Sequence, residues 1–421
     1  MAETPFPGTP ASSRSSAREK RQAAARRRGF AVFVALAVVA TGVAWAIRAP
    51  GDDAGGRAGS NQGGGQGSGG GSGAATPSTS APASASPSEA TSPTPSTALP
   101  PGENPIKRVI FVVKENRSFD NYFGRYPGAD GATEGPRSDG TTIPLVEAVD
   151  VQPFDLGHDF RAGLLAINGG KMNGFDKINA ATGKPSDAIA GYSAFTREGM
   201  PNYWAYADRF VLSDHFFTSM YGPTFPEHLY VIAAQSNGIV GNKLTADHEG
   251  GYCDDPTEFA PRFRPGLTAQ EEQRIMDLER PKDGFDREDL VEITQYWEQI
   301  RSCFDIPVLP DRLEEAGISW KYYAHDNVWM NGMQAIRHVR FGPMWNKVQE
   351  PDQFLVDVKA GELPEVSWLI PPEPYNEHPG AGKSVCAGEN WFVEQVNAVM
   401  QSKYWKDTAI VLVWDDFGGF Y

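Results

Sequence analysis

The chain has little of the positive charge that a nucleic-acid-binding protein needs. Its 421 residues include 38 Lys and Arg against 53 Asp and Glu, which gives a formal net charge of −15. Residues 1–28 hold seven basic and two acidic side chains, so the remainder of the chain carries −20. Because so acidic a surface repels phosphate backbones, we expect no nucleic-acid partner.

Cysteine is scarce as well, with Cys253, Cys303 and Cys386 as the three thiols. None of them lies in a Cys-x-x-Cys pattern, so a zinc site of that type is not predicted. In an oxidising compartment a disulfide between Cys253 and Cys303 would staple the polar insertion that we expect at about residues 252–305. Cys386 would then be left over.

Large apolar side chains are missing from residues 51–104, where Leu99 is the only one among Gly, Ser, Pro, Ala and Thr. Such a segment cannot bury enough apolar surface to offset the entropy lost on ordering. We therefore expect a disordered linker at residues 49–104 and one large domain at residues 105–421.

Charge is absent from residues 29–47, a run of 19 apolar and small residues. A helix of that length spans roughly 28 Å, close to the hydrocarbon core of a bilayer. The three arginines at 26–28 directly precede the run, which by the positive-inside rule makes residues 1–28 a cytoplasmic tail. We predict a transmembrane signal anchor at residues 29–48, with the domain held outside the cell membrane. The alternative is a signal peptide cleaved near residues 44–46, which would release a secreted domain.

Strand-like and helix-like segments alternate through the expected domain. Buried strands are predicted where β-branched and aromatic residues run together, at 109–113, 318–324, 366–370 and 410–414. Helices are predicted from apolar spacing and stop signals at 309–316 and 392–400, and within the insertion at 269–278 and 290–300. Repeated helix-to-strand units with right-handed crossovers imply an α/β sandwich with a mostly parallel central sheet.

Oxygen-donating side chains follow the first and the last of these strands. Glu115 and Asn116 come after the first strand, and Asp415 and Asp416 come after the last. Ligands bind beyond the carboxyl ends of parallel strands, and three carboxylates gathered there would repel one another unless a cation lay among them. We predict that these four residues bind a hard or borderline divalent metal cation. Ordinary strand-end and helix-capping roles are the alternative.

Five motifs stand in a fixed order along the domain. They are Glu115-Asn116-Arg117-Ser118-Phe119-Asp120, Asp155-Leu156-Gly157-His158, Gly222-Pro223-Thr224-Phe225-Pro226, Glu377-His378-Pro379 and Trp414-Asp415-Asp416-Phe417-Gly418-Gly419. Together they resemble the motifs of the phosphoesterase family that holds bacterial phospholipases C, acid phosphatases and plant non-specific phospholipases C. The resemblance covers the chain from about Ile106 to its end. It implies an alkaline-phosphatase-like three-layer core, a bound divalent cation and a covalent phosphoenzyme.

The resemblance also implies roles for single residues. Thr224 occupies the nucleophile position, although Thr224-x-x-Glu227 before an apolar run is equally the pattern of a helix capping box. The two roles are compatible, because a helix N-terminus offers free amides to a phosphate. His158 and His378 match family positions that bind phosphate or protonate the leaving alkoxide.

Two further residues are candidates for binding the substrate. Family members usually carry Asn and a basic residue where this chain has Glu227 and His228. An ionised Glu227 cannot donate a hydrogen bond to phosphate, whereas His228 would replace the basic residue. Arg117 would hold phosphate bidentately, or alternatively pair with Asp120.

The residues and the resemblance together predict an exported, membrane-anchored, metal-dependent phosphoesterase. We expect a phospholipase C that acts on phospholipid through a phosphothreonine intermediate. An acid phosphatase acting on phosphomonoesters is the alternative among enzymes, and a surface protein that binds phosphate without turnover is the alternative of another class. The chain ends two residues after Gly419, where the family motif continues into an Asp-His-Val segment, so we expect the domain to be incomplete at its C-terminus.

Overall fold

The computed structural model describes residues 104–421 except 183–188, 244–250, 282–283, 327–328 and 381. These residues fall within one compact unit. The predicted tail and anchor, and all but the last residue of the predicted linker, lie outside the described residues, so these three segments stay predictions. Among the helices that the structure describes, none is long and apolar enough to cross a bilayer.

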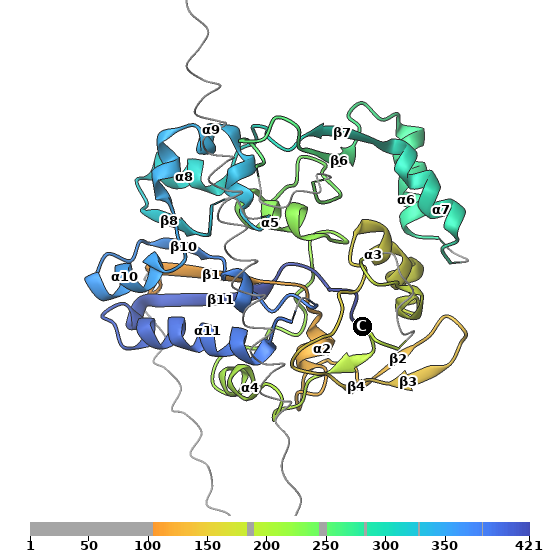
Figure 1. Ribbon diagram of the computed structural model, residues 1–421, viewed down its shortest axis with the longest axis horizontal. Helices are drawn as coiled ribbons and strands as arrows, with labels where there is room; N and C mark the ends of the chain where they lie inside the picture. Colours follow the sequence, from red (N-terminus) through yellow and green to blue (C-terminus); the bar gives the residue numbers. More distant parts are fainter. Residues whose placement is uncertain (1–103, 183–188, 244–250, 282–283, 327–328, 381) are drawn as a thin grey trace, which may run out of the picture. The chain divides into compact units, whose positions relative to one another are not determined.

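A five-stranded sheet runs through this unit (Figure 1), with the strand order β11-β1-β10-β8-β9. In that order the strands are Thr408–Trp414, Arg108–Lys114, Val366–Leu369, Trp320–Tyr323 and Val348–Gln349. Every neighbouring pair is parallel, so the chain crosses over between neighbours rather than turning back in a hairpin. The predicted α/β fold with a mostly parallel central sheet is confirmed.

The sheet has a hydrophobic core on each face, because successive side chains of a strand point to opposite sides. Phe111 and Val113 of β1 pack into one core, and Ile110 and Val112 pack into the other. The first core packs against α5 (Thr224–Ala233), α8 (Leu309–Ala316) and α9 (Arg337–Arg340). The second packs against α4 (Pro201–Ala207), α10 (Gln353–Ala360) and α11 (Val385–Met400). Figure 1 shows α8 and α9 on one side of the sheet and α11 on the other.

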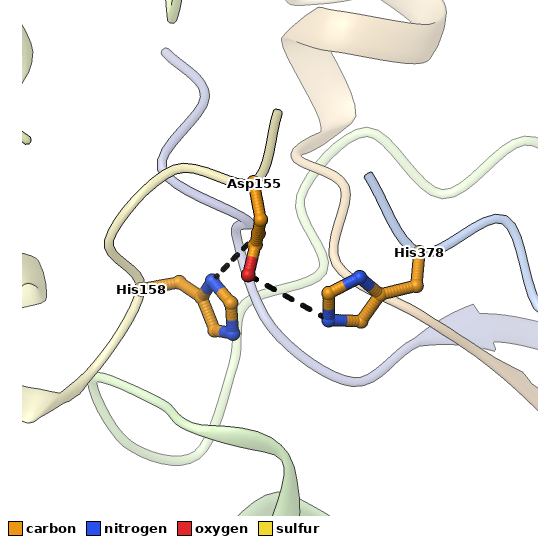
Figure 2. Close-up of side chains that lie close together, drawn as sticks. All are labelled: Asp155, His158 and His378. Atoms are coloured by element: carbon orange, nitrogen blue, oxygen red, sulfur yellow. Dashed lines mark ion pairs between the residues drawn. The ribbon is translucent and has the colours of Figure 1, made fainter. Parts of the chain in front are cut away.

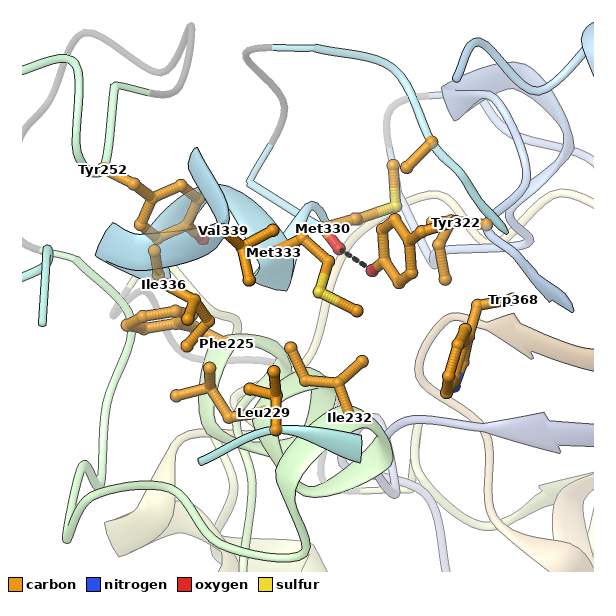
Figure 3. Packing of buried hydrophobic residues seen from close by; sticks show 14 of the residues in the cluster. Phe225, Leu229, Ile232, Tyr252, Tyr322, Met330, Met333, Ile336, Val339 and Trp368 are labelled. Carbon is orange, nitrogen blue, oxygen red and sulfur yellow. Dashed lines mark hydrogen bonds between the residues drawn. The ribbon is translucent and has the colours of Figure 1, made fainter. Parts of the chain in front are cut away.

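The first core fixes the helix that begins at Thr224. Phe225, Leu229 and Ile232 recur at helical spacing along α5, and each is at most 1% exposed. Figure 3 shows them facing Met333 and Trp368 across the cluster. Burying each of these side chains contributes about 1.5–3 kcal/mol, so packing holds this helix firmly against the sheet.

The remaining strands form three small two-stranded sheets, β2-β3, β4-β5 and β6-β7, and further helices accompany them. The short strands are β2 (Glu134–Pro136), β3 (Thr142–Pro144), β4 (Val146–Glu147), β5 (Ser193–Ala194), β6 (Phe259–Phe263) and β7 (Trp297–Arg301). The helices are α2 (Phe119–Phe123), α3 (Phe160–Ile167), α6 (Ala269–Glu279) and α7 (Arg287–Ile293). The side chains of α3, α6 and α7 share one satellite core.

The helix predicted at residues 290–300 is wrong over its second half. The helix α7 ends at Ile293, and Trp297–Arg301 forms β7, which pairs antiparallel with β6. Pairing across the two ends of the insertion therefore overrides the local helical pattern. The helix predicted at 269–278 is confirmed as α6, which starts at a Thr268 capping box.

Capping residues set the end of α8 and the start of α11. The prediction for α8 is confirmed from Leu309 to Ala316, and Gly317 ends it with a left-handed φ of 67°. The helix α11 begins seven residues before the predicted 392, because the Ser384 hydroxyl accepts the Ala387 N–H and caps it there.

The last strand is less buried than its apolar sequence predicts. Every residue of β11 is half-buried, because this strand lies at the edge of the sheet with β1 as its neighbour. The central strand β1, paired on both sides, is the more deeply buried of the two.

The predicted disulfide between Cys253 and Cys303 is confirmed, and Cys386 is a free, exposed thiol. The two bonded cysteines are 50 residues apart in sequence, yet their Cα atoms are 4.5 Å apart. The segment between them therefore leaves and re-enters the fold at one place, as expected of an insertion.

Breaking this disulfide should destabilise the domain. A cross-link that closes a loop of this size restricts the unfolded chain, and its loss typically costs about 2–4 kcal/mol. We expect Cys253→Ser to lower the free energy of unfolding by that amount in denaturant titrations. The matched control, Cys386→Ser, should leave it unchanged, and equal effects of the two substitutions would contradict the assignment.

Candidate active site and metal centre

The carboxyl ends of β1 and β11 lie side by side and bring the predicted metal ligands together. Lys114 pairs with Trp414 in the parallel register, and the Asp415 N–H donates to the Lys114 carbonyl at 2.9 Å. The Asn116 N–H in turn donates to Asp415 Oδ1 at 2.7 Å. A Cβ on Gly418 would lie 2.2 Å from the Asn116 carbonyl oxygen, so only glycine allows this close approach.

The helix α5 adds a hydroxyl and an imidazole to this edge. Thr224 Oγ1 donates to Glu115 Oε2 at 3.3 Å, and His228 Nε2 lies 3.2 Å from Glu115 Oε1. The same His228 atom lies 4.0 Å from Asp415 Oδ2. Thr224 and His228 reach the same place because residues four apart share one face of a helix.

The gathered acids are buried and hard to ionise together. Burial raises the pKa of Glu115 to about 8, and burial together with the charge of Glu115 raises that of Asp415 to about 7. Burial and the charge of Asp415 hold the pKa of Asp416 well above its usual value. Asp416 Oδ2 is buried and has no hydrogen-bond partner among the described residues. A divalent cation would compensate these charges.

The Asn116 amide lies between the carboxylates and two imidazoles. One end of it lies 2.9–3.2 Å from oxygens of Asp415 and Glu115, and the other lies 3.0 Å from Nε2 of both His158 and His378. With its nitrogen toward the acids, the amide donates to them and accepts from the imidazoles. With its oxygen toward the acids, it adds a further oxygen ligand, an arrangement that requires a cation among them.

The residues present therefore fit the metal that the sequence predicts. Oxygen donors converge from two adjacent strand ends, one buried carboxylate oxygen lacks a partner, and the ligand atoms of Glu115, His228 and Asp415 lie within 4.8 Å of one another. The residues that would hold the cation are Glu115, Asn116, Asp415 and Asp416, and His228 lies beside them.

A second cluster contacts the other end of the Asn116 amide. It consists of Asp155, His158 and His378 (Figure 2). Asp155 stands between the two histidines, with Oδ1 3.4 Å from His158 Nδ1 and Oδ2 4.0 Å from His378 Nε2. The two imidazole rings meet edge to face with centroids 5.7 Å apart. The structure thus brings both predicted catalytic histidines together. Sequence reasoning missed Asp155 as a site residue, although its motif, Asp-x-x-His, contained the signal.

The two imidazoles have opposite protonation tendencies. Burial alone would lower the pKa of His158, but the charge of Asp416 and the contact with Asp155 raise it to about 10. Burial lowers the pKa of His378 to about 4 against the weaker pull of Asp155. At neutral pH these shifts favour the protonated form of His158 and the neutral form of His378.

Exposure differs between the two halves of the site. The side chains of Glu115 and His228 are at most 1% exposed, whereas those of His158, His378 and Asp155 are 10%, 15% and 26% exposed. The carboxylate side is therefore sealed, and the histidine side is the one that meets solvent.

Thr224 is not a helix cap, so the predicted capping box is wrong. Pro223 is the N-cap residue of α5 and provides no side-chain hydrogen bond. Glu227 instead accepts a hydrogen bond from the Thr218 hydroxyl, and the Phe225 N–H donates to Asn242 Oδ1 at 2.9 Å. Because the Thr224 hydroxyl does not cap the helix, it can donate its hydrogen bond to the Glu115 carboxylate.

The two predicted substrate-binding residues have other neighbours. His228 faces the carboxylates of Glu115 and Asp415, as described above. Arg117 donates to the Glu377 carbonyl at 3.0 Å and to the Tyr122 hydroxyl at 3.3 Å, and its guanidinium lies over the Phe420 ring. The alternative ion pair with Asp120 is absent from the ion pairs of the described residues, and Asp120 accepts the Ala132 N–H instead.

A buried ion pair that the sequence did not reveal supports the site from behind. Lys114 and Glu377 have no exposed side-chain surface, and they are bonded through Nζ and Oε1. Glu377 also accepts from the hydroxyls of Tyr122 and Tyr203 and from the Trp414 indole. Since these two residues directly precede Glu115 and His378, the pair ties together the segments that carry both halves of the site.

Comparison with known proteins places these residues in a family context. The model of the Phosphoesterase family matches residues 106–421. Phospholipase C A of Mycobacterium tuberculosis is 26% identical over 356 residues, which are 75% of this chain and 59% of that protein. Hemolytic phospholipase C of Pseudomonas aeruginosa is 24% identical over 365 residues, which are 75% of this chain and 43% of that protein. Non-specific phospholipase C1 of Arabidopsis thaliana is 26% identical over 350 residues, which are 76% of this chain and 54% of that protein. The chain thus spans about half the length of these relatives.

Removing one member of the buried ion pair should destabilise the domain strongly. Glu377→Ala would leave the Lys114 ammonium buried without a partner, which costs about 3–5 kcal/mol in the free energy of unfolding. Urea titrations would measure the loss. The control is Glu298→Ala, which breaks the half-exposed pair with Arg262 and should cost less than about 1 kcal/mol.

Metal removal should lower the thermal stability of the domain. A cation that binds only the folded state adds about 2.7 kcal/mol at a concentration 100 times its dissociation constant. We expect a divalent ion to raise the Tm of chelator-treated protein, and Asp415→Asn to abolish the rise. Exposed Asp254→Asn is the control, and an unchanged response of the Asp415 variant would place the ion elsewhere.

Proposed function

The chain belongs to the Phosphoesterase family, and on that premise we propose that its folded part is a metal-dependent hydrolase of phosphate esters with Thr224 as nucleophile. The observation that carries the proposal is the position of the Thr224 hydroxyl. It donates to Glu115 at 3.3 Å at the start of α5, beside an amide that lies 3.0 Å from two imidazoles. Nucleophile, acids and proton donor thus lie within one buried cluster.

The side chains of this cluster can carry out both halves of a double displacement. Thr224 Oγ1 forms a bond to phosphorus as the bond from phosphorus to the alcohol oxygen breaks. The hydroxyl proton passes to Glu115 Oε2, which a bound cation would keep ionised against the burial that raises its pKa to about 8. His158, which is protonated at neutral pH, gives its proton to the leaving alkoxide. Water then attacks the phosphothreonine and passes a proton to His158 as the bond from phosphorus to Thr224 Oγ1 breaks. Glu115 returns its proton to Thr224 Oγ1, which regenerates the hydroxyl.

A divalent cation held by the carboxylates would favour the alkoxide of Thr224 and screen the charge of the phosphoryl group. The chain's own contribution is to bury these groups, so that their electrostatic interactions are little weakened by water. Because the histidine side is the more exposed one, the alcohol leaves through it.

A phospholipid diester is the substrate that we favour, with hydrolysis of the phospholipase C type. Support comes from the curated relatives, whose names describe phospholipases C from bacteria and a plant. A phosphomonoester is the alternative, because the reacting groups suit either ester. We further propose an alkaline-phosphatase-like core, on the basis of the parallel sheet and the family motifs.

We also propose that the domain acts outside the cell, anchored by residues 29–48. The support is the uncharged run behind a basic tail, together with the Cys253–Cys303 disulfide, a bond typical of oxidising compartments. A linker of residues 49–104 would give the domain a reach of roughly 40 Å from the membrane, enough to approach phospholipid or a scavenged phosphate ester.

A surface protein that binds phosphate without turnover is the second candidate. Glu227 favours it, because this buried carboxyl lies near Asp415 and Asp416, where it adds negative charge beside the site for an anionic substrate. Burial raises the pKa of Glu227 to about 8, so near neutral pH the protonated form is largely present and the repulsion is reduced. The contact of the Thr224 hydroxyl with Glu115 and the family membership are why we place the enzyme first.

Replacing the nucleophile separates the two candidates. We expect Thr224→Ala to lower turnover by at least about 10³-fold, because no other side chain replaces the attacking oxygen, and Thr224→Ser to retain part of it. The assay compares a phosphocholine diester with a simple phosphate monoester, with and without chelator.

Faster, chelator-sensitive release from the diester would identify a phospholipase C, and preference for the monoester would identify a phosphatase. The control is Thr218→Ala. It removes the threonine hydroxyl that donates a hydrogen bond to Glu227, and it leaves the Thr224 hydroxyl in place. Phosphate binding without Thr224-dependent turnover on either ester would favour the non-catalytic candidate.

A further inference from the structure

His228 occupies a position in which an imidazole can act on a metal rather than on a phosphate. Its side chain is 1% exposed, and its Nε2 atom faces Glu115 Oε1 at 3.2 Å and Asp415 Oδ2 at 4.0 Å. We propose that His228 is a direct ligand of the cation bound by Glu115 and Asp415, and that its nitrogen selects a borderline transition ion such as Zn²⁺ or Co²⁺ over Mg²⁺ and Ca²⁺. The proposal rests on the metal site of the proposed function and extends it to the class of metal.

The distances between the donor atoms match a coordination shell. Ligand atoms about 2.1 Å from a metal lie about 3.0–3.4 Å apart when adjacent and about 4.2 Å apart when opposite. The 3.2 Å separation between His228 Nε2 and Glu115 Oε1 falls in the adjacent range, and the 4.0 Å separation from Asp415 Oδ2 lies between the adjacent and the opposite values. The three ligand atoms of His228, Glu115 and Asp415 all lie within 4.8 Å of one another.

The charge balance of the cluster also calls for a cation at this point. Among the ion pairs of the described residues, the partner of Glu115 and Asp415 is His228, with no Lys or Arg. The nearby cations are paired elsewhere. Lys114 is bonded to Glu377, and Arg117 donates to the Glu377 carbonyl. Lys383, whose charge acts on Glu115, lies 3.8 Å from Glu373. A single imidazole cannot neutralise two buried carboxylates, whereas a divalent ion among the three side chains can.

The chemistry of the donors sets the choice of metal. Carboxylate and amide oxygens alone suit Mg²⁺, Ca²⁺ or Mn²⁺, whereas imidazole nitrogen favours zinc and the later transition metals. A set of two or three carboxylates, one amide and one imidazole therefore shifts the preference of this site toward Zn²⁺ and Co²⁺. A second role for His228, as a hydrogen-bond donor to Glu115 with no metal bond, is the competing interpretation.

The test uses the full chain freed of metal by chelation, with binding measured by calorimetry. We expect His228→Gln, which keeps a polar donor but removes the imidazole, to weaken Zn²⁺ and Co²⁺ binding about 10–100-fold and to weaken Mg²⁺ binding less. The matched control is His325→Gln, which replaces a half-exposed histidine paired with Glu350 and should bind like the wild type. Equal weakening for Zn²⁺ and Mg²⁺, or none, would overturn the proposal.

A spectroscopic measurement on the unmodified chain keeps the test valid if the variant folds poorly. Loaded with Mn²⁺ as a probe, the wild type and the His325 variant should show the ¹⁴N coupling of a coordinated imidazole in pulsed EPR, and His228→Gln should lack it. Binding of Mn²⁺ without nitrogen coupling in the wild type would reduce His228 to a hydrogen-bond partner of Glu115 and leave the metal site itself intact. Failure of the wild type to bind any of these ions would overturn both this proposal and the metal site of the proposed function.

Discussion

Repulsion among the carboxylates of Glu115, Asp415 and Asp416 is the constraint on which the rest of the site depends. Backbone pairing between β1 and β11 brings Glu115 and Asp415 together in a buried place. Burial first, and then the charges of neighbouring acids, raise their pKa values to about 8 and about 7. The surroundings offset that cost with the Asn116 amide and with imidazoles, and a cation bound among the acids would offset it further. The functional chemistry follows from this compensation, because the groups that relieve the repulsion are also those that would act on a phosphate ester.

The buried pair of Lys114 and Glu377 solves a related problem on the opposite side of the same strand end. Successive side chains of β1 point to opposite sides, so Lys114 points away from the metal ligands. Its ammonium group therefore pairs with Glu377 and not with the neighbouring acids. Glu377 itself has a left-handed φ of 72°, unfavourable for a side chain with a Cβ, and its carbonyl is held by Arg117. Two sets of buried charges therefore stay separate although their residues are neighbours in sequence.

The sequence predicted what depends on short-range pattern and on strand ends. Apolar runs located the four longer strands of the sheet, and the rule that parallel strands share a carboxyl edge located Glu115, Asn116, Asp415 and Asp416. What it missed depends on tertiary partners. Residues 297–301 pair with β6 instead of continuing a helix. Thr224 contacts Glu115, because Pro223 and not Thr224 is the N-cap residue of α5. Asp155 is part of the site because the fold places it next to His378, which is distant in sequence.

The contact between Asn116 and Asp415 spans 299 residues of sequence. At roughly 5–20 residues per second, a ribosome needs roughly 15 to 60 s to travel from one to the other. For all of that time β1 lacks β11, and until Leu369 has been made it lacks β10 as well. An unpaired apolar strand of this kind is aggregation-prone and needs protection during synthesis. The same delay has a protective side, since the clustered acids, the threonine and the histidines cannot act on phosphate esters until nearly the whole of these 421 residues has been made.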